Sequence, residues 1–217
     1  MIHTELHKET VSDTLWWVLK QLMEIEMLSS FRLVGGTSLS LQLGHRMSVD
    51  IDLFTDAEYG SINFDQIDIE LQRKFPFIEM QYEGNNGFGK SYFIGKSKDD
   101  IVKTDLFYTD HFIRRAVVSD SIRMASIEDI VAMKMEIIGQ NGRKKDFWDI
   151  HELMDVMSFK QMIELHTERY PYTYTPEELK VKLIDFQYAD ADFDPICLRG
   201  QYWELIKEDI EEEVNLI

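Results

Sequence analysis

The sequence has almost no cysteine and no long apolar run. Cys197 is the single cysteine among 217 residues, so an internal disulfide is excluded and a reducing compartment is expected. Cys197 also lies in no Cys/His cluster, which argues against a zinc site. There is no charged-then-apolar leader, and no apolar stretch approaches the ~18 residues that would suggest a membrane span. We therefore expect a cytoplasmic protein with no membrane partner.

Basic residues are also scarce. There are 23 lysines and arginines against 40 aspartates and glutamates, which gives a net charge of −17. Broad nucleic-acid binding depends on neutralising phosphates, so this balance disfavours it. A local basic surface could still form from two short clusters, Arg114-Arg115 and Arg143-Lys144-Lys145. The acidic run near the C-terminus, from Glu208 to Glu213, is predicted to be a solvated helix face.

Hydrophobic periodicity divides the chain into a strand-rich first part and a helical second part. Residues 10–30 and 63–74 read as helices, and residues 31–35 and 48–54 as strands around a helix at 37–44. Alternating runs follow in hairpins punctuated by glycines, namely Phe77 to Tyr82, Ser91 to Ile94 and Ile101 to Phe107, with Gly84, Gly87, Gly89 and Gly95. Helices are predicted from Ser126, a candidate N-cap, onward at 145–157, 159–168, 176–186 and 201–214.

This pattern predicts an α/β (α+β) fold, with a small mixed-sheet core and a C-terminal helical bundle. Residues 1–125 are expected to form the core with its N-terminal helix, and residues 126–217 a helical region packed on it. The length suits one domain, or one domain with a helical extension.

Two carboxylates share one face of the predicted strand 48–54. Asp50 and Asp52 are two residues apart, and alternate residues of a strand point to the same side. Like charges in this position repel each other, and a cation between them removes the conflict. Their oxygen atoms are the ligands that Mg²⁺ or Mn²⁺ prefers.

Gly35 and Gly36 come just before the predicted helix 37–44. A strand that ends in two glycines can turn sharply and present bare backbone N–H groups to an anion. A phosphate at that helix N-terminus would also meet the positive end of the helix dipole. Either motif alone is usually only a turn or a solvated edge. Together, about ten residues apart, they indicate a site for a nucleoside triphosphate.

The segment resembles the signature of the nucleotidyltransferase superfamily related to DNA polymerase β. That signature is a hydrophobic residue, Gly-Gly-x-Ser, and then Asp-hydrophobic-Asp-hydrophobic, here Val34 to Ser38 and Asp50 to Leu53. With His45, Arg46 and Ser48 the longer string is similar to the AbiEii/AbiGii toxin family, the toxins of bacterial abortive-infection and toxin–antitoxin systems. The resemblance covers about residues 15–210 and is strongest at 34–54.

The resemblance implies a role for each matching residue. It implies a metal site for Mg²⁺ (or Mn²⁺) made by Asp50, Asp52 and Asp105. It implies nucleotide binding by Gly35, Gly36, Thr37, Ser38, Arg46 and Ser48. A helical lysine followed by a Lys-Asp-x-x-Asp element recurs in the family, here Lys134 and then Lys145 to Asp149. The implied catalytic set is Asp50, Asp52, Asp105, Lys134 and Asp146.

Two of these assignments have structural alternatives. Asp105 lies between apolar neighbours in a predicted strand, where an unpaired carboxylate is costly. It either completes the metal site or pairs with Lys103 or an arginine. Lys134 lies in an apolar helix, where it either reaches the nucleotide phosphate or forms a salt bridge with Asp146.

The predicted function is metal-dependent transfer of a nucleoside monophosphate from NTP to an acceptor hydroxyl, with release of pyrophosphate. The acceptor hydroxyl could belong to RNA, to a protein or to a small molecule. RNA would have to be held by a local basic patch. The resemblance also implies an antitoxin partner encoded nearby. Two alternatives are a nucleotide-binding regulator without turnover and an interaction module whose acidic face binds a basic partner, because fold alone does not decide activity.

Overall fold

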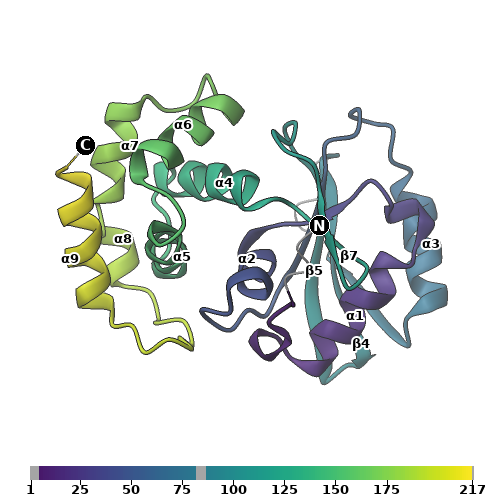
Figure 1. Cartoon of the computed structure of the whole chain (residues 1–217). Helices are drawn as coiled ribbons and strands as arrows, with labels where there is room; N and C mark the ends of the chain where they lie inside the picture. Colours follow the sequence, from purple (N-terminus) through teal and green to yellow (C-terminus); the bar gives the residue numbers. More distant parts are fainter. Residues whose placement is uncertain (1–4, 82–86, 217) are drawn as a thin grey trace. The chain divides into compact units, whose positions relative to one another are not determined.

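The computed structural model describes residues 5–81 and 87–216, so Tyr82 and Gly84 of the predicted hairpins lie outside it (Figure 1). The chain forms two compact units. The core unit consists of Met1–Gly44, Ser48–His111 and Arg115–Ala125, and the helical unit of His45–Met47, Phe112–Arg114 and Ser126–Ile217. The two short segments of the helical unit therefore come from before residue 125.

The core unit is built on a mixed sheet. Over the described residues its strand order is β3-β4-β5-β2-β1-β7-β6, in which β2 runs parallel to β5 and antiparallel to β1. The strands are β1 (Arg32–Leu33), β2 (Ile51–Thr55), β3 (Phe77–Gln81), β4 (Gly89–Ser97), β5 (Asp100–Tyr108), β6 (Val117–Ser119) and β7 (Ile122–Met124).

The hairpin β6–β7 was not predicted from the sequence. Its two loop residues, Asp120 and Ser121, have φ of 49° and 63°, as a tight two-residue hairpin loop requires. Glycine or asparagine is the usual signal for such a loop, and neither is present here. The strands on either side are also only three residues long, too short for an alternation to stand out.

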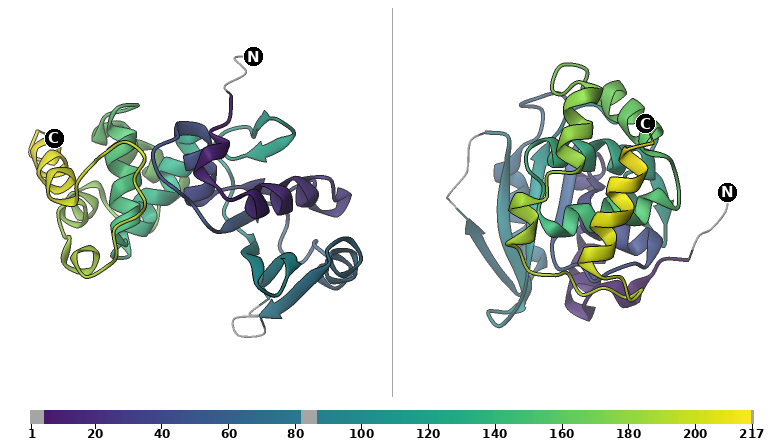
Figure 2. Two further views of the ribbon diagram at one scale, coloured as in Figure 1. Left: turned by 90° about the horizontal axis from the view of Figure 1, so that it is seen from below. Right: turned by 90° about the vertical axis from the view of Figure 1, so that its left-hand side faces the viewer.

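Helices α1 (Asp13–Met23) and α3 (Phe64–Lys74) pack on one face of the sheet, as Figures 1 and 2 show. Leu15, Leu19 and Ile67 from these helices form one buried cluster with Ile51 and Leu53 of β2. Because side chains alternate along a strand, Asp52 must point to the opposite face. The burial of Ile51 and Leu53 therefore positions the acidic residues.

Helix α2 (Gly35–Leu43) begins two residues before the predicted start and ends at Gly44. Gly44 has a φ of 72°, the left-handed conformation that glycine adopts at helix ends, so the predicted stop is confirmed. The predicted helix 10–30 is divided, because α1 ends at Met23 and a short 3₁₀ turn follows at Glu26–Leu28. Another 3₁₀ turn, Lys8–Thr10, precedes α1.

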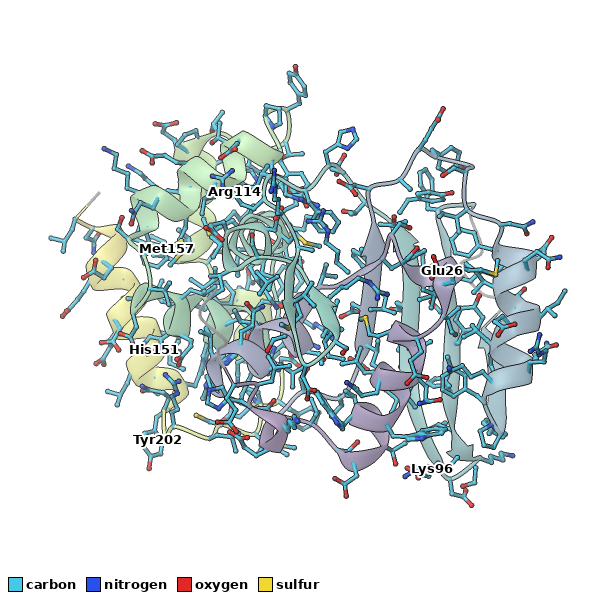
Figure 3. All side chains as sticks on the ribbon, turned by 45° about the vertical axis from the view of Figure 1, so that its right-hand side comes forward. Glu26, Lys96, Arg114, His151, Met157 and Tyr202 are labelled. Atoms are coloured by element: carbon cyan, nitrogen blue, oxygen red, sulfur yellow. The ribbon has the colours of Figure 1, made fainter. Side chains whose placement is uncertain are left out.

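The helical unit contains α4 (Ile127–Gly139), α5 (Lys144–Met154), α6 (Phe159–Arg169), α7 (Pro176–Leu183), α8 (Gln187–Asp190) and α9 (Trp203–Val214). Ser126 caps α4 as predicted, because its Oγ accepts a hydrogen bond from the Asp129 N–H. In Figure 3 His151 of α5 lies toward α9, where its Nε2 is 2.8 Å from Asp209 Oδ2. The acidic residues of α9 from Glu211 to Glu213 are exposed, as predicted.

In the described part of the chain, no helix has the length and apolar character needed to cross a bilayer.

Candidate functional site

The acidic face of the core unit is formed by neighbouring parallel strands. Asp52 of β2 and Asp105 of β5 are register partners, so their side chains leave the sheet side by side on the same face. Asp50 immediately precedes β2, two residues before Asp52. All three side chains are half-buried, whereas Ile51 and Leu53 between and beside them are fully buried. The strand predicted over 48–54 begins only at Ile51, so Asp50 does not share it with Asp52 as predicted, whereas Asp52 and Asp105 do leave the sheet on the same face.

The first turn of α2 lies against this face. Gly35 has a φ of +66°, and a Cβ added there would lie 2.8 Å from Asp52 Oδ2, so both conformation and space require glycine. The Val34 N–H donates a hydrogen bond of 2.9 Å to the Asp52 carbonyl, which ties the turn to β2. No side chain caps the helix N-terminus at Val34. The glycine pair therefore brings backbone and helix dipole close to a carboxylate.

Lys103 brings a positive charge to the same face. It lies two residues before Asp105 on β5, and its Nζ is 2.7 Å from Asp105 Oδ2. Burial lowers the pKa of Lys103, but the hydrogen bond to Asp105 and the charges of Asp105, Asp52 and Asp50 outweigh this and raise it. All three acids therefore act on one ammonium group. The pairing of Asp105 with Lys103, one of the two sequence-based alternatives, is present.

The acidic face has the donors that a hard divalent cation needs. Asp105 Oδ1 is buried and has no hydrogen-bond partner, which leaves one carboxylate oxygen unsatisfied. The surrounding donors are carboxylate oxygens, the ligand type of Mg²⁺ and Mn²⁺. Across residues 5–81 and 87–216, however, no three acidic, histidine or cysteine side chains are already gathered in a metal-ligating arrangement. The carboxylate oxygens are thus of the right type to bind a divalent cation. In this structure the ammonium group of Lys103 contacts Asp105.

Three predicted nucleotide-binding hydroxyls are buried inside the core unit. Thr37 Oγ1 donates a hydrogen bond to the Asp50 carbonyl and lies 2.8 Å from Ser48 Oγ. Gln42 Nε2 donates to Ser38 Oγ at 3.2 Å. The Thr37 contacts hold α2 against the segment that leads into β2, whereas the contact between Gln42 and Ser38 lies within α2. A role for the three hydroxyls in binding nucleotide stays a prediction, as does that of the half-buried Gly36.

The helical unit contains a buried ion cluster centred on Asp149. Arg46 contacts both oxygens of this carboxylate, through Nε at 2.6 Å and an η-nitrogen at 2.8 Å. Lys134 Nζ lies 2.6 Å from Asp149 and 2.7 Å from Asp146, and His45 Nε2 lies 2.7 Å from Asp149. None of these side chains is more than 4% exposed. We call these five residues the Asp149 cluster.

The Asp149 cluster keeps its carboxylates ionised. Burial alone raises the pKa of Asp149, but the charges of Lys134 and Arg46 and the hydrogen bonds from His45 and Arg46 hold it well below its usual range. Burial likewise opposes ionisation of Asp146, and Lys134 lowers the pKa of Asp146 overall. The salt bridge between Lys134 and Asp146 is the structural alternative considered for Lys134. Contact of Lys134 or Arg46 with a nucleotide stays a prediction.

Sequence reasoning missed the central position of Asp149, whereas the contact of Lys103 with Asp105 was one of its two alternatives. Asp149 follows Asp146 by one helical turn, and residues 146–150 are buried without interruption. Asp149 lies between the apolar residues Trp148 and Ile150, and this placement was the available signal, because burying a carboxylate requires a cationic partner. The partner Arg46 is 103 residues away in sequence, so its identity could not be inferred from spacing.

The basic clusters are partly committed to other contacts. Arg114, labelled in Figure 3, forms two hydrogen bonds with the Glu168 carboxylate, at 2.7 Å and 3.1 Å. Lys144 is buried and lies 2.9 Å from Asp194. Arg115 and Arg143 are exposed. Arg115 belongs to the core unit and Arg143 to the helical unit, and a role for either in binding RNA stays a prediction.

Comparison with known proteins assigns the family. A family model described as "Nucleotidyl transferase AbiEii toxin, Type IV TA system" matches residues 17–216, most of the chain. The chain belongs to the AbiEii nucleotidyltransferase toxin family. As a member of the AbiEii family, it is a nucleotidyltransferase. An uncharacterized protein of Aquifex aeolicus (strain VF5) is 28% identical over 207 residues, which are 91% of this chain and 85% of that protein.

Solved structures share the fold of this AbiEii member. JHP933 from Helicobacter pylori has a TM-score of 0.57 at 16% identity, over 93% of this chain and 88% of its own. MenT4, a nucleotidyltransferase toxin from Mycobacterium tuberculosis H37Rv, has a TM-score of 0.53 at 12% identity, over 94% of this chain and 84% of its own. At such identities these similarities establish the fold only.

Proposed function

We propose that this AbiEii-family transferase moves a nucleoside monophosphate from NTP to an acceptor hydroxyl and requires Mg²⁺ or Mn²⁺ to do so. The observation that carries the proposal is the adjacent placement of Asp52 and Asp105 on one face of the sheet, against the Gly35 turn. Helix N-termini bind phosphate and carboxylates bind hard cations. The N-terminus of α2 and the two carboxylates therefore lie close enough together to bind a metal–triphosphate complex.

Asp50, Asp52 and Asp105 would hold the metal. A bound divalent cation supplies charge stabilisation for attacking and leaving oxygens in an in-line phosphoryl displacement. The Gly35-Gly36 backbone would orient the outer phosphates of NTP at the start of α2. Asp105, whose Oδ1 has no partner, would position the acceptor hydroxyl for attack on the α-phosphate. Pyrophosphate leaves as the second product.

The proposed biological role is that of a toxin paired with an antitoxin, following the family description of a type IV toxin–antitoxin system. The acceptor defines the toxic reaction, and RNA, protein and small-molecule hydroxyls are the candidates. The net charge of −17 opposes RNA approach except at a local basic patch.

The test is transfer of label from each α-³²P-labelled NTP to material in a cell lysate, with Mg²⁺, Mn²⁺ or EDTA. We expect labelling with metal, none with EDTA, and none with Asp52→Asn. Asp65→Asn, which also removes one exposed charge but lies on α3, should retain wild-type labelling. Digestion of the product with RNase or protease identifies the acceptor class. Equal labelling by wild type and Asp52→Asn would refute the proposed site.

A further inference from the structure

Lys103 is a cationic side chain on which the charges of all three carboxylates of the acidic face act, and its ammonium contacts one of them directly. Its Nζ lies 2.7 Å from Asp105 Oδ2, the same oxygen-rich position where a metal ligand is proposed. Asp105 Oδ1 remains buried without a partner. The ammonium therefore offsets part of the negative charge of the face and satisfies only one oxygen of Asp105.

We propose that Lys103 is the built-in counter-cation of the metal-free enzyme, and that a divalent cation must displace its ammonium group from Asp105 in order to bind. This inference rests on the proposed metal site. An ammonium and a divalent cation cannot both neutralise the same carboxylate at contact distance without strong repulsion. Lys103 is thus a positioning residue that competes with the metal.

The side chain of Lys103 is suited to displacement. It is 41% exposed, and four methylene groups link its ammonium to the backbone, so the group can rotate into solvent without moving β5. By contrast, the Asp105 side chain is only 16% exposed and is fixed by its strand register with Asp52. The carboxylates stay in place while the cation exchanges. This arrangement keeps the acidic face folded before metal arrives.

Competition has a measurable consequence for metal affinity. Removing the ammonium should make the nucleotide-free protein bind Mn²⁺ more tightly, because the metal no longer has to displace a bound charge. It should also lower the melting temperature in EDTA, because Asp105 then loses the ammonium that opposes its repulsion by Asp52 and Asp50. A merely structural salt bridge predicts the second effect without the first.

The experiment is calorimetric titration of the full-length, nucleotide-free protein with Mn²⁺. Lys103→Met and Lys103→Gln should each bind Mn²⁺ about tenfold more tightly than wild type. This is the order of magnitude expected when one partly exposed positive charge no longer competes with the metal. Lys103→Arg keeps the charge and should bind like wild type. Lys98→Met removes an exposed lysine from the turn between β4 and β5 and should also leave affinity unchanged, which controls for net charge.

The outcomes separate this inference from the proposed function. Wild-type or weaker Mn²⁺ affinity in Lys103→Met and Lys103→Gln overturns the competition, while loss of binding in Asp52→Asn would still uphold the metal site. If no variant binds Mn²⁺, both are overturned. Thermal unfolding in EDTA and in saturating Mn²⁺ gives the second readout, and Mn²⁺ should raise the melting temperature of Lys103→Met more than that of wild type.

Discussion

Asp149 shows how one buried carboxylate organises several distant residues. The Asp149 carboxylate is fully buried, and its two oxygens contact the charged or polar groups of Arg46, Lys134 and His45. Burial of an ion pair is tolerated when geometry and hydrogen bonding are complete, and removal of one partner then leaves an uncompensated charge. Each member of the Asp149 cluster is therefore expected to matter more for stability than its individual contacts suggest.

Lys134→Met should destabilise the protein strongly. The substitution keeps the apolar stem but removes the cation between Asp146 and Asp149, which are both buried. Loss of one partner of such a pair costs about 3–5 kcal/mol. Urea unfolding at pH 7 measures the change, with Lys160→Met on the exposed side of α6 as the control. A loss no larger than that of the control would contradict the structural role.

The fall in the free energy of unfolding at acidic pH should depend on Asp149. The pKa of Asp149 in the folded chain is held well below its usual range. Its contribution to the free energy of unfolding is therefore complete above about pH 4, the pKa in the unfolded chain, and is lost as the pH falls through the pKa in the folded chain. We expect Asp149→Asn to be less stable than wild type at pH 7, with the difference shrinking toward pH 3. Asp155→Asn, an exposed site at the end of α5, should show no such convergence. Urea unfolding at each pH measures these free energies. A difference between Asp149→Asn and wild type that does not change with pH would contradict the lowered pKa of Asp149.

At the scale of elements, the contact between α2 and the lead into β2 sets the position of the acidic face. Thr37 of α2 donates to the Asp50 carbonyl and contacts Ser48, so one buried hydroxyl fixes both segments. Gly35 at the other end of the same turn lies against Asp52. The helix therefore sets the separation between the glycine turn and the carboxylates.

Thr37→Val should remove this link without changing side-chain shape. We expect a loss of about 1–3 kcal/mol in unfolding free energy, the cost of leaving buried hydrogen-bonding groups unpaired. Transferase activity should fall further than stability predicts, because Asp50 loses its anchor. Ser40→Ala, at a buried α2 hydroxyl that has no hydrogen-bond partner, is the matched control and should lose little of either. Full activity in Thr37→Val would show that Asp50 is positioned by other contacts.

Elements with a strong local signal were the predictable ones. The helical periodicity of 63–74 matched α3, because burial on one face imposes the pattern directly. The alternation around Asp52 also identified β2, although this strand begins at Ile51 and not at residue 48 as predicted. The Gly44 stop and the Ser126 cap were also local chemistry. The strand order was not accessible in this way, since pairing of β2 with β5 joins segments about fifty residues apart.

The same distinction applies to the candidate site. The side-by-side position of Asp52 and Asp105 could be proposed from alternation together with family resemblance. That Lys103 contacts Asp105 was one of two open alternatives, because sequence does not show which cation is nearest. Arg46 and His45 could not be linked to Asp149, because that contact depends on how a three-residue segment packs among helices.

At the scale of the whole molecule, the two units are interleaved along the chain. The backbone passes from one to the other at residues 44/45, 47/48, 111/112, 114/115 and 125/126. The segment His45–Met47 supplies Arg46 and His45 to Asp149, and Ile113 and Arg114 supply backbone N–H donors to buried Asp129. The helical unit is therefore incomplete without these segments.

A fragment of residues 126–217 should not fold as it does in the full chain. Without residues 45–47 and 112–114, the carboxylates of Asp149 and Asp129 lose buried donors, which costs several kcal/mol. Far-UV circular dichroism and urea unfolding of the fragment measure this. A fragment that unfolds as cooperatively as the full chain would contradict the prediction.

The interleaving also limits how this toxin could evolve or be engineered. Recombination at a single point can exchange a contiguous piece of coding sequence, but the helical unit is encoded in three separate pieces. A chimera joined at 125/126 would combine one protein's Arg46 with another protein's Asp149. Only parents that already agree at both positions would yield a folded product, so the helical unit of this protein should be inherited together with its core unit rather than acquired as a module.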